Sequence, residues 1–383
     1  MSEAWPEPLH EASASGKVVL FGEYTVLEGG SALVWASARQ VVARWCGALS
    51  CAEPELRRYE LRAPSLGEGA WEGRLKPEWS LIERLSLATG QRTGTDFGFA
   101  WATLKALDAP SGRYEVDSEA FGQWSGPEGE RCWRKLGLGS SAASVASLVS
   151  LCAQLKGQAL ESAERYRLTQ LIHHQVQGAL GSGVDAAASS YGGLLRYRWQ
   201  PQSVARCAPL GPPLGPSEER VEVRAKEELI GTATLSALSA ELPRCAWVWM
   251  GRSASTTSLV RQVQRYRSAQ PDHYQSLMSQ LSEAEASAYE ALSVLEPAPR
   301  QRAWSEAVRR GAEATRALSE HTGAAVWTSG HSELQRLIAP LGAWVKPTGA
   351  GGGDLALACA PSPESHAELC AHISAQGWEL IEL

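Results

Sequence analysis

The 383-residue chain carries a formal net charge of −6 at pH 7, which argues against a nucleic-acid-binding protein because such proteins need a basic surface. Its hydrophobic fraction of 44% is normal for a globular protein, and its length suits two domains. No run approaches about 18 consecutive apolar residues, and the first residues lack the basic start of a signal peptide. We therefore expect a cytoplasmic protein with neither a nucleic acid nor a membrane as partner.

The first half of the chain alternates predicted strands and helices. Residues 50–130 hold short elements separated by glycine and proline, so their order is hard to read. Small residues followed by larger apolar ones from Ser140 onward predict a helix that packs closely at its start. We predict strands over 17–21 and 32–42, and helices over 81–87, 99–107, 140–156 and 161–180.

A proline-rich stretch over 201–217 is the predicted domain boundary, which gives domains 1–217 and 218–383. Helical patterns dominate the second domain before a final strand–helix–strand segment. We predict helices over 257–270, 273–295, 299–321 and 364–376, and strands over 355–359 and near Trp378.

The eight cysteines are scattered and form no Cys-x-x-Cys pair, so the sequence does not support a zinc site. Reduced thiols, mostly buried, are the expected state of these residues.

The run from Lys135 to Ala143 is rich in glycine and serine and leads into a predicted helix. Glycines let successive backbone N–H groups point into one concavity, and the helix adds free N-terminal donors and the positive end of its dipole. The run lacks the Gly-Lys-Ser/Thr ending of a Walker A loop. A serine-capped glycine turn without a ligand is an almost equally good interpretation of this run alone.

Three other segments have a similar character. Gly181-Ser182-Gly183-Val184-Asp185 places an acid on a restrained turn, where it can orient or deprotonate an acceptor or simply cap a helix. The run 349–354 is almost purely glycine and alanine, which favours close approach to a ligand over a flexible hairpin loop. Lys17 enters an apolar strand, where a carboxylate such as Asp185 would offset the cost of burial.

Lysine is rare in this chain, and three of its seven lysines lie in these glycine-rich segments: Lys17, Lys135 and Lys346. Because an ammonium group is a common phosphate ligand, this placement favours a phosphate-binding role for at least one of the three. Chance and a bias toward arginine are the alternative explanation.

The glycine-rich motifs, in this order, resemble those of the GHMP kinase family, and the resemblance spans Lys17 to Asp354. The resemblance implies an α+β fold, the GHMP kinase fold. Its N-terminal domain would be like ribosomal protein S5 domain 2, its C-terminal domain would be ferredoxin-like, and ATP would bind in the cleft between them.

The resemblance also implies ATP and Mg²⁺ as cofactors and assigns roles to residues. Lys17 and Asp185 would be catalytic, and Ser140 or Ser141 would bind Mg²⁺. The nucleotide would contact Lys135, Gly137, Leu138, Gly139, Ser140, Ser141, Ala142, Gly349, Gly351 and Gly352. The acceptor would contact Tyr24, Ser182, Gly183, Ser253, Ser255 and Thr256. Separately from the resemblance, Arg196, Arg198 and Arg252 are candidates for its phosphate because they lie near these motifs in the sequence.

Within the family, the motifs are most similar to those of members that phosphorylate phosphomevalonate. Members that act on mevalonate have a histidine in place of Tyr24, a magnesium-binding glutamate where His173 falls, and a cysteine in the position of Asp354. Two positions depart from the pattern: Val184 stands where an aromatic residue is common, and Leu355 where a cysteine is common.

This similarity implies ATP-dependent phosphorylation of 5-phosphomevalonate to 5-diphosphomevalonate, in the mevalonate route to isoprenoids, by a monomer or homodimer. A kinase that acts on mevalonate or another alcohol is the main alternative. A non-catalytic relative is a second alternative, which the intact Lys17, Ser140 and Asp185 disfavour.

Overall fold

The computed structural model describes residues 5–50, 57–64, 70–75, 81–86, 98–125, 132–177, 181–201, 219–225, 228–251 and 256–383. The strands are β1 (His10–Phe21), β2 (Ser31–Ala48), β3 (Arg57–Arg62), β4 (Ala70–Leu75), β5 (Leu81–Ser86), β6 (Gly112–Asp117), β7 (Gly122–Ser125), β8 (Cys132–Lys135), β9 (Leu194–Pro201), β10 (Glu219–Ala225), β11 (Glu228–Leu238), β12 (Ala246–Trp249), β13 (Trp344–Pro347), β14 (Leu355–Cys359) and β15 (Glu379–Leu380). The α-helices are α1 (Gly98–Ala106), α2 (Ser140–Leu155), α3 (Ser162–Gln177), α4 (Val184–Tyr191), α6 (Thr256–Ala269), α7 (Pro271–Leu292), α8 (Pro297–Thr322), α9 (Ser329–Ile338) and α10 (His366–Ala375).

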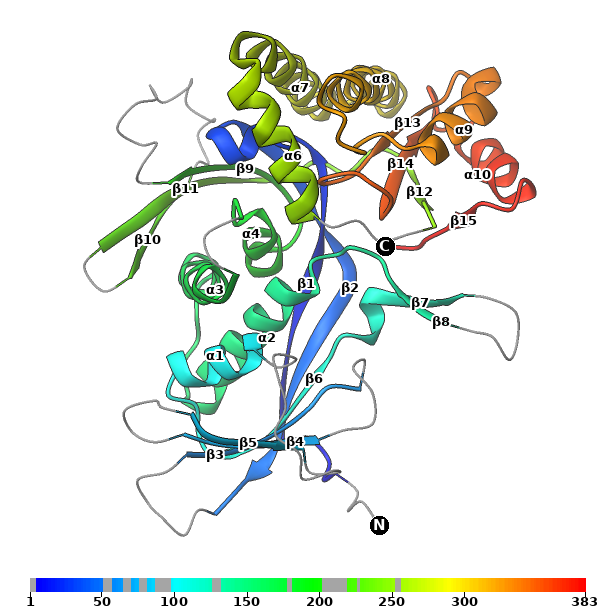
Figure 1. The fold of residues 1–383 in the computed structure, drawn as a ribbon. Helices are drawn as coiled ribbons and strands as arrows, with labels where there is room; N and C mark the ends of the chain where they lie inside the picture. The colour runs from blue at the N-terminus through cyan, green and yellow to red at the C-terminus, as the bar shows by residue number, and fades with distance from the viewer. Residues whose placement is uncertain are drawn as a thin grey trace.

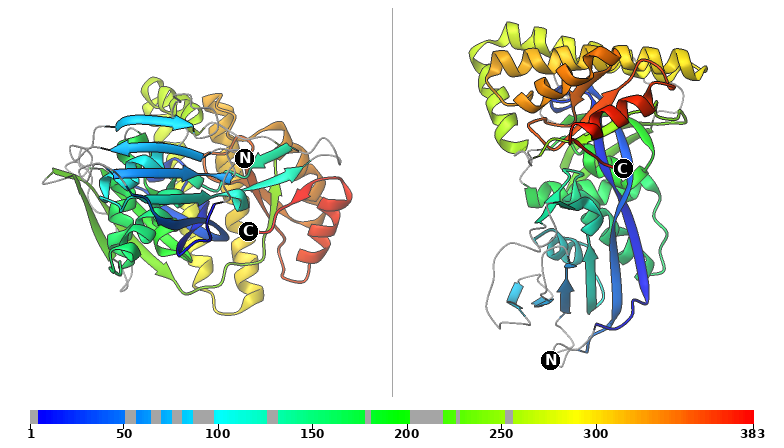
Figure 2. Two further views of the ribbon diagram at one scale, coloured as in Figure 1. Left: turned by 90° about the horizontal axis from the view of Figure 1, so that it is seen from below. Right: turned by 90° about the vertical axis from the view of Figure 1, so that its right-hand side faces the viewer.

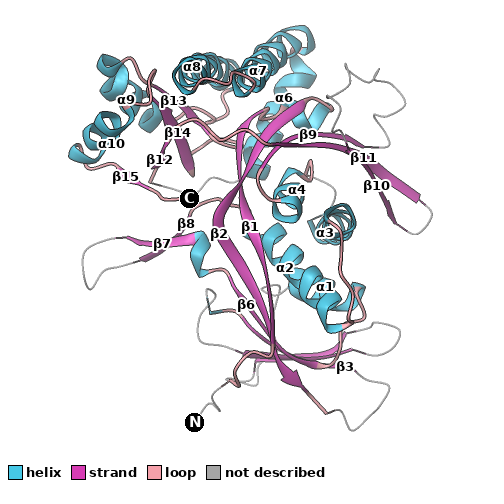
Figure 3. Ribbon diagram, turned by 180° about the vertical axis from the view of Figure 1, so that it is seen from behind, coloured by secondary structure: helices cyan, strands magenta, loops and turns pink. Residues whose placement is uncertain are grey.

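The larger sheet has nine strands in the described ranges, in the order β10-β11-β9-β2-β6-β3-β4-β5, with β1 paired to β2. Helices α1 to α4 lie along one side of this sheet (Figure 1, Figure 3). Strands β1 and β2 are long and extend toward the C-terminal half of the molecule (Figure 2). Because α2 and α4 both pack on β1, the start of each helix can meet side chains of that strand.

A second, four-stranded sheet has the order β13-β14-β12-β15, and all its pairs are antiparallel. Helices α9 and α10 share a buried apolar cluster with its strands, and α8 packs against β13. Helix α7 lies beside α8 and also contacts β1 and β2, so it joins the two halves of the molecule.

Most of the predicted elements are confirmed, including the helix from Ser140, the three long helices between 257 and 321, and the strand over 355–359. The helix predicted over 81–87 is wrong, because these residues form β5, which pairs antiparallel with β4. A short segment of mixed polarity has no strong local preference, and strand pairing decides its conformation.

The proline-rich stretch itself falls on residues outside the described ranges. Beyond it, β10 and β11 continue the larger sheet through pairing of β11 with β9. We therefore propose that the first domain extends to the end of β11 at Leu238, beyond the predicted boundary at 217.

The expected thiol state is confirmed for several cysteines. Cys46, Cys152 and Cys359 are free and buried, and Cys245 and Cys370 are free and half-buried. No helix in the described part of the chain is both long and apolar enough to cross a membrane.

Candidate active site

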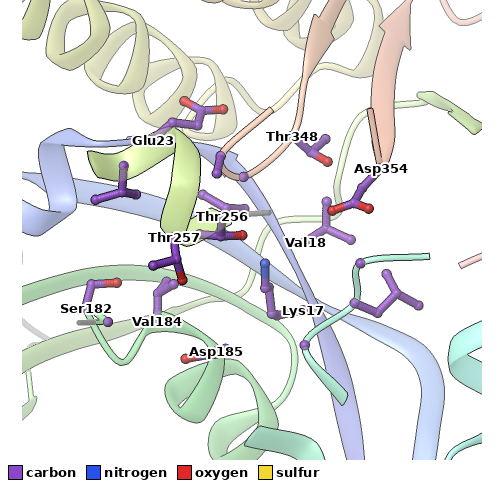
Figure 4. Close-up of a pocket in the computed structure, with 18 of the residues that line it drawn as sticks. Lys17, Val18, Glu23, Ser182, Val184, Asp185, Thr256, Thr257, Thr348 and Asp354 are labelled. Carbon is purple, nitrogen blue, oxygen red and sulfur yellow. The ribbon is translucent and has the colours of Figure 1, made fainter. Parts of the chain in front are cut away.

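A cavity of about 350 Å³ brings the glycine-rich motifs together. It is partly open to solvent and lies among β1, the starts of α2, α4 and α6, and the loop between β13 and β14 (Figure 4). Of the predicted site residues, it is lined by Lys17, Tyr24, Lys135, Gly137, Leu138, Gly139, Ser140, Ser141, Ser182, Asp185, Thr256 and Gly349.

The start of α2 has the features of an anion site. Gly137 and Gly139 have φ of 73° and 76°, the left-handed region that glycine adopts without strain. Gly139 is the N-cap of α2, and no hydrogen bond from a described side chain caps this helix. Its first amides are therefore free to bind phosphate oxygens, with the helix dipole favouring negative charge. Ala142, predicted to contact the nucleotide, is completely buried and does not line the cavity.

Lys17 reaches this helix start from β1. A register shift between β1 and β2 occurs just before it, and such irregularities re-aim side chains. The Lys17 amide donates to the carbonyl of Leu138 at 2.8 Å, which ties β1 to the loop before α2. A side chain at Gly139 would place its Cβ 3.1 Å from Cγ of Lys17 and 3.5 Å from Cβ of Asp185. The structure thus brings the predicted lysine and aspartate to the same point.

Asp185 lies in the first turn of α4, whose N-cap is Gly183 with a φ of 78°. Its Oδ1 accepts from the Ala186 amide at 3.0 Å. The expected pairing of Lys17 with a carboxylate such as Asp185 is not found: no ion pair of Lys17 occurs within the described ranges. The side chains of both residues face the cavity (Figure 4), which leaves the Lys17 ammonium available to a ligand.

Hydrogen bonds of two buried tyrosines fix the loop before α4. The carbonyl of Ser182 accepts from the hydroxyl of Tyr197 at 2.5 Å, and that hydroxyl lies 3.0 Å from the hydroxyl of Tyr166. Gly183 has a left-handed φ, and a Cβ there would lie 2.4 Å from Oε1 of Gln170, so glycine is strongly favoured. Gly183 therefore positions its neighbours and does not itself line the cavity.

Ser141 is held by a buried histidine. Its Oγ lies 3.1 Å from Nε2 of His173, whose ring stacks on Phe99 with centroids 5.0 Å apart. His173 is 3% exposed, so its ring orientation is fixed by packing. The hydrogen bond leaves lone-pair capacity on the Ser141 oxygen for a ligand.

The donors in this cavity suit magnesium bound to a nucleotide. Mg²⁺ prefers oxygen ligands and usually combines one or two protein groups with waters and substrate phosphates. The hydroxyls of Ser140 and Ser141 and the carboxylate of Asp185 are such donors on the cavity wall. No cluster of three or more His, Cys, Asp or Glu side chains in the described ranges could hold a metal by itself, so the phosphates would supply the other ligands.

The glycine–alanine run 349–354 has one part that lines the cavity and another that packs against the protein. Gly349 and Ala350 line the cavity. Gly351 and Gly352, predicted to contact the nucleotide, pack against Val326 instead: the Gly352 amide donates to its carbonyl at 3.0 Å, and a Cβ at Gly351 would lie 2.5 Å from the same oxygen.

Lys346 is not a phosphate ligand, although its place in the motif suggested one. It is completely buried, and its ammonium donates to the carbonyls of Leu20 and Pro347, at 2.7 Å each, and to Glu23. Burial raises the pKa of Glu23, and the Lys346 ammonium opposes that rise. All three ammonium protons are thus engaged within the protein.

One wall of the cavity, formed by α6, was only partly predicted. Thr256 is the first residue of α6 and lines the cavity, whereas Ser253, Ser255 and Arg252 lie outside the described residues. The helix also contributes residues spaced by one turn, which the predicted helical period could have indicated. These additional lining residues are Thr257, Val260, Arg261 and Gln264.

The other two candidate arginines point elsewhere. Arg196 forms a bidentate pair with Glu285 of α7 at 2.9 and 3.0 Å and lies over the ring of Tyr289. Arg198 donates to the Ser31 hydroxyl at 3.1 Å. Neither lines the cavity, so the prediction that they meet an acceptor phosphate is not supported.

Comparison with known proteins identifies the fold. Residues 101–193 match the family model described as the GHMP kinases N terminal domain. The phosphomevalonate kinase of Streptococcus pneumoniae, solved in complex with phosphomevalonate and AMPPNP, superposes with a TM-score of 0.69 at 20% identity, covering 97% of this chain and 98% of that one. The chain therefore contains a GHMP kinase N-terminal domain and has the GHMP kinase fold over nearly its whole length, which confirms the fold and the resemblance predicted from the motifs.

Two curated relatives cover shorter stretches. The phosphomevalonate kinase of Streptomyces sp. (strain CL190) is 28% identical over 225 residues, 59% of this chain and 57% of that protein. The mevalonate kinase of Pyrococcus horikoshii is 28% identical over 195 residues, 49% of this chain and 50% of that protein. The chain thus matches about half the length of these relatives.

Proposed function

We propose that this protein transfers the γ-phosphoryl group of ATP to 5-phosphomevalonate, giving 5-diphosphomevalonate and ADP. The observation that carries the proposal is the meeting of Lys17 and Asp185 at the uncapped start of α2, in a cavity lined by all the glycine-rich motifs. Free helix amides and an unpaired ammonium are the groups that hold and neutralise a triphosphate.

The chemistry of the acceptor explains why positive charge matters more than a base. The second pKa of a phosphate monoester is about 6, so the acceptor is mostly a dianion at neutral pH and needs little deprotonation. The main barrier is the approach of two polyanions. Described cations on the cavity wall are Lys17, Lys135 and Arg261, and they offset this repulsion by positioning and charge.

Magnesium would be held by Ser140 or Ser141 together with the nucleotide, and when bound it neutralises phosphate charge. Lys17, placed between the start of α2 and the loop after β13, would lie against the transferred group. Asp185 would orient the acceptor or Lys17. These assignments also explain why the Lys17 ammonium has no ion-pair partner among the described residues.

A kinase that acts on mevalonate is the second candidate, favoured by the Asp185 carboxylate beside Lys17. An alcohol acceptor must lose a proton, and a positioned aspartate could accept it. The similarity of this chain to the Pyrococcus horikoshii mevalonate kinase supports the same alternative.

The decisive experiment measures ADP release by the purified protein with Mg·ATP, offering mevalonate and 5-phosphomevalonate separately. Turnover with 5-phosphomevalonate alone is the expected result. Turnover with mevalonate alone would overturn the acceptor assignment and make Asp185 the candidate general base. ATP binding without turnover on any small-molecule acceptor would favour a non-catalytic relative.

A further inference from the structure

The turn after β1 is joined by two polar contacts to β13 and to the loop that follows β13. The first is the ion pair of Lys346 with Glu23, both buried. The second is a hydrogen bond of 2.8 Å from the Tyr24 hydroxyl to the carbonyl of Ala350. We call Glu23, Tyr24, Lys346 and Ala350 the turn–loop contact.

The turn that provides Glu23 and Tyr24 is strained and closely packed. Tyr24 has a φ of 63°, in the left-handed region that side chains other than glycine rarely adopt. Gly22 has a φ of 87°, and a Cβ there would lie 2.2 Å from the carbonyl oxygen of Ser31. Such a conformation persists only where its surroundings fix it, and the contacts to Lys346 and Ala350 are part of those surroundings.

The loop on the other side of the contact forms a wall of the cavity. Gly349 and Ala350 line it, and a Cβ at Gly349 would lie 3.7 Å from Nζ of Lys17. The Gly349 amide also donates to the carbonyl of Val19 at 3.1 Å. The turn–loop contact therefore helps to fix the position of this loop relative to the Lys17 ammonium.

We propose that Glu23, Tyr24 and Lys346 are positioning residues that hold the Gly349–Ala350 backbone against Lys17, so that the phosphate cleft is formed before the nucleotide binds. The proposal rests on the proposed phosphoryl transfer. A buried ammonium with three acceptors, one of them a carboxylate, fixes one geometry, whereas apolar side chains could pack in several.

The alternative is that the contact contributes only to overall stability. Tyr24→Phe tests this, because it removes one hydroxyl and keeps the ring. Tyr59→Phe is the matched control: the buried Tyr59 also donates a 2.8 Å hydrogen bond to a backbone carbonyl, that of Ala109, and it does not line the cavity.

A second pair of variants tests the ion pair. Lys346→Met alone leaves the Glu23 carboxylate buried without its partner and should lower Tm strongly. Adding Glu23→Gln removes that charge and should recover much of the Tm. The double variant therefore separates loss of stability from loss of the contact.

The readouts are Tm, hydrogen exchange of the segment 344–354, AMPPNP affinity, and kcat and KM with 5-phosphomevalonate. Tyr24→Phe and Tyr59→Phe should lower Tm by similar amounts. Only Tyr24→Phe and the double variant should speed exchange in 344–354 and weaken AMPPNP binding, each by about tenfold, the scale of one hydrogen bond.

Equal exchange and equal AMPPNP affinity in Tyr24→Phe and Tyr59→Phe would overturn the positioning role. Wild-type hydrogen exchange and wild-type AMPPNP affinity in the double variant would overturn the positioning role of the ion pair between Glu23 and Lys346. Hydrogen exchange needs no acceptor. If the wild-type protein phosphorylates neither acceptor, the proposed function fails while the exchange comparison still decides the role of the contact.

Discussion

The side chain of Lys17 lies directly against the backbone of Gly139, where an added Cβ would be 3.1 Å from its Cγ and 3.3 Å from its Cε. Asp185 approaches the same glycine from α4. The missing side chain at Gly139 is therefore what lets the lysine and the aspartate meet at the start of α2.

Gly139→Ala should reduce kcat/KM by about a hundredfold, because displacing Lys17 by a fraction of an ångström misaligns the reacting groups. The left-handed φ of Gly139 also strains an alanine. Gly157→Ala is the matched control, since Gly157 has a φ of 68° and nothing within 4 Å of an added Cβ. Steady-state kinetics and Tm of both variants check the prediction, which fails if both lose activity equally.

Asp185→Asn should lower kcat by less than about tenfold with 5-phosphomevalonate, because a dianionic acceptor needs no general base. The asparagine can still accept from the Ala186 amide, so α4 should be retained. A loss of about 10²–10⁴-fold, the usual contribution of general base catalysis, would contradict this expectation and favour an alcohol acceptor.

Ser141→Ala should raise the Mg²⁺ concentration needed for half-maximal activity, because it removes an oxygen donor beside the phosphates. His173→Phe should shift it in the same direction by a smaller factor, since Ser141 keeps its hydroxyl but loses the partner 3.1 Å away. Ser150→Ala, farther along α2, removes only a hydrogen bond to the Ala146 carbonyl. Magnesium titrations in which all three variants match the wild type would remove Ser141 from the metal site.

Local sequence was enough to predict the glycine turn and the helix start at α2, where we propose an anion site. The glycines and serines of this run indicate a turn and a helix start, and the helix that follows is visible in the periodicity. The one-turn spacing of Thr257, Arg261 and the other residues of α6 would likewise have shown which face lines the cavity.

Contacts between distant residues could not be predicted in this way. Lys346 is separated by 323 positions from the carboxylate that allows its burial, so its sequence context suggests a phosphate ligand. β5 has a strand conformation because β4 lies beside it. The pairing of Arg196 with Glu285 could not be predicted either, because Glu285 is 89 positions away.

The pair of Arg196 and Glu285 gives a prediction on stability. Arg196 lies on β9 and Glu285 on α7, and the Glu285 side chain is 3% exposed, so Arg196→Met leaves a carboxylate buried without its cation. We expect a loss of about 3 kcal/mol in the free energy of unfolding, measured by urea denaturation. Arg316→Met is the control, because Arg316 and Glu320 are 63% and 60% exposed and such pairs contribute less than about 1 kcal/mol.

The same variant separates the structural role of Arg196 from a role in acceptor binding. Since Arg196 does not line the cavity, the KM for 5-phosphomevalonate should stay within about twofold of the wild type at a temperature where Arg196→Met is folded. Adding Glu285→Gln should recover part of the lost stability, because it removes the uncompensated charge. A large rise in KM without loss of stability would place Arg196 in the acceptor site and contradict the position that the structure gives it.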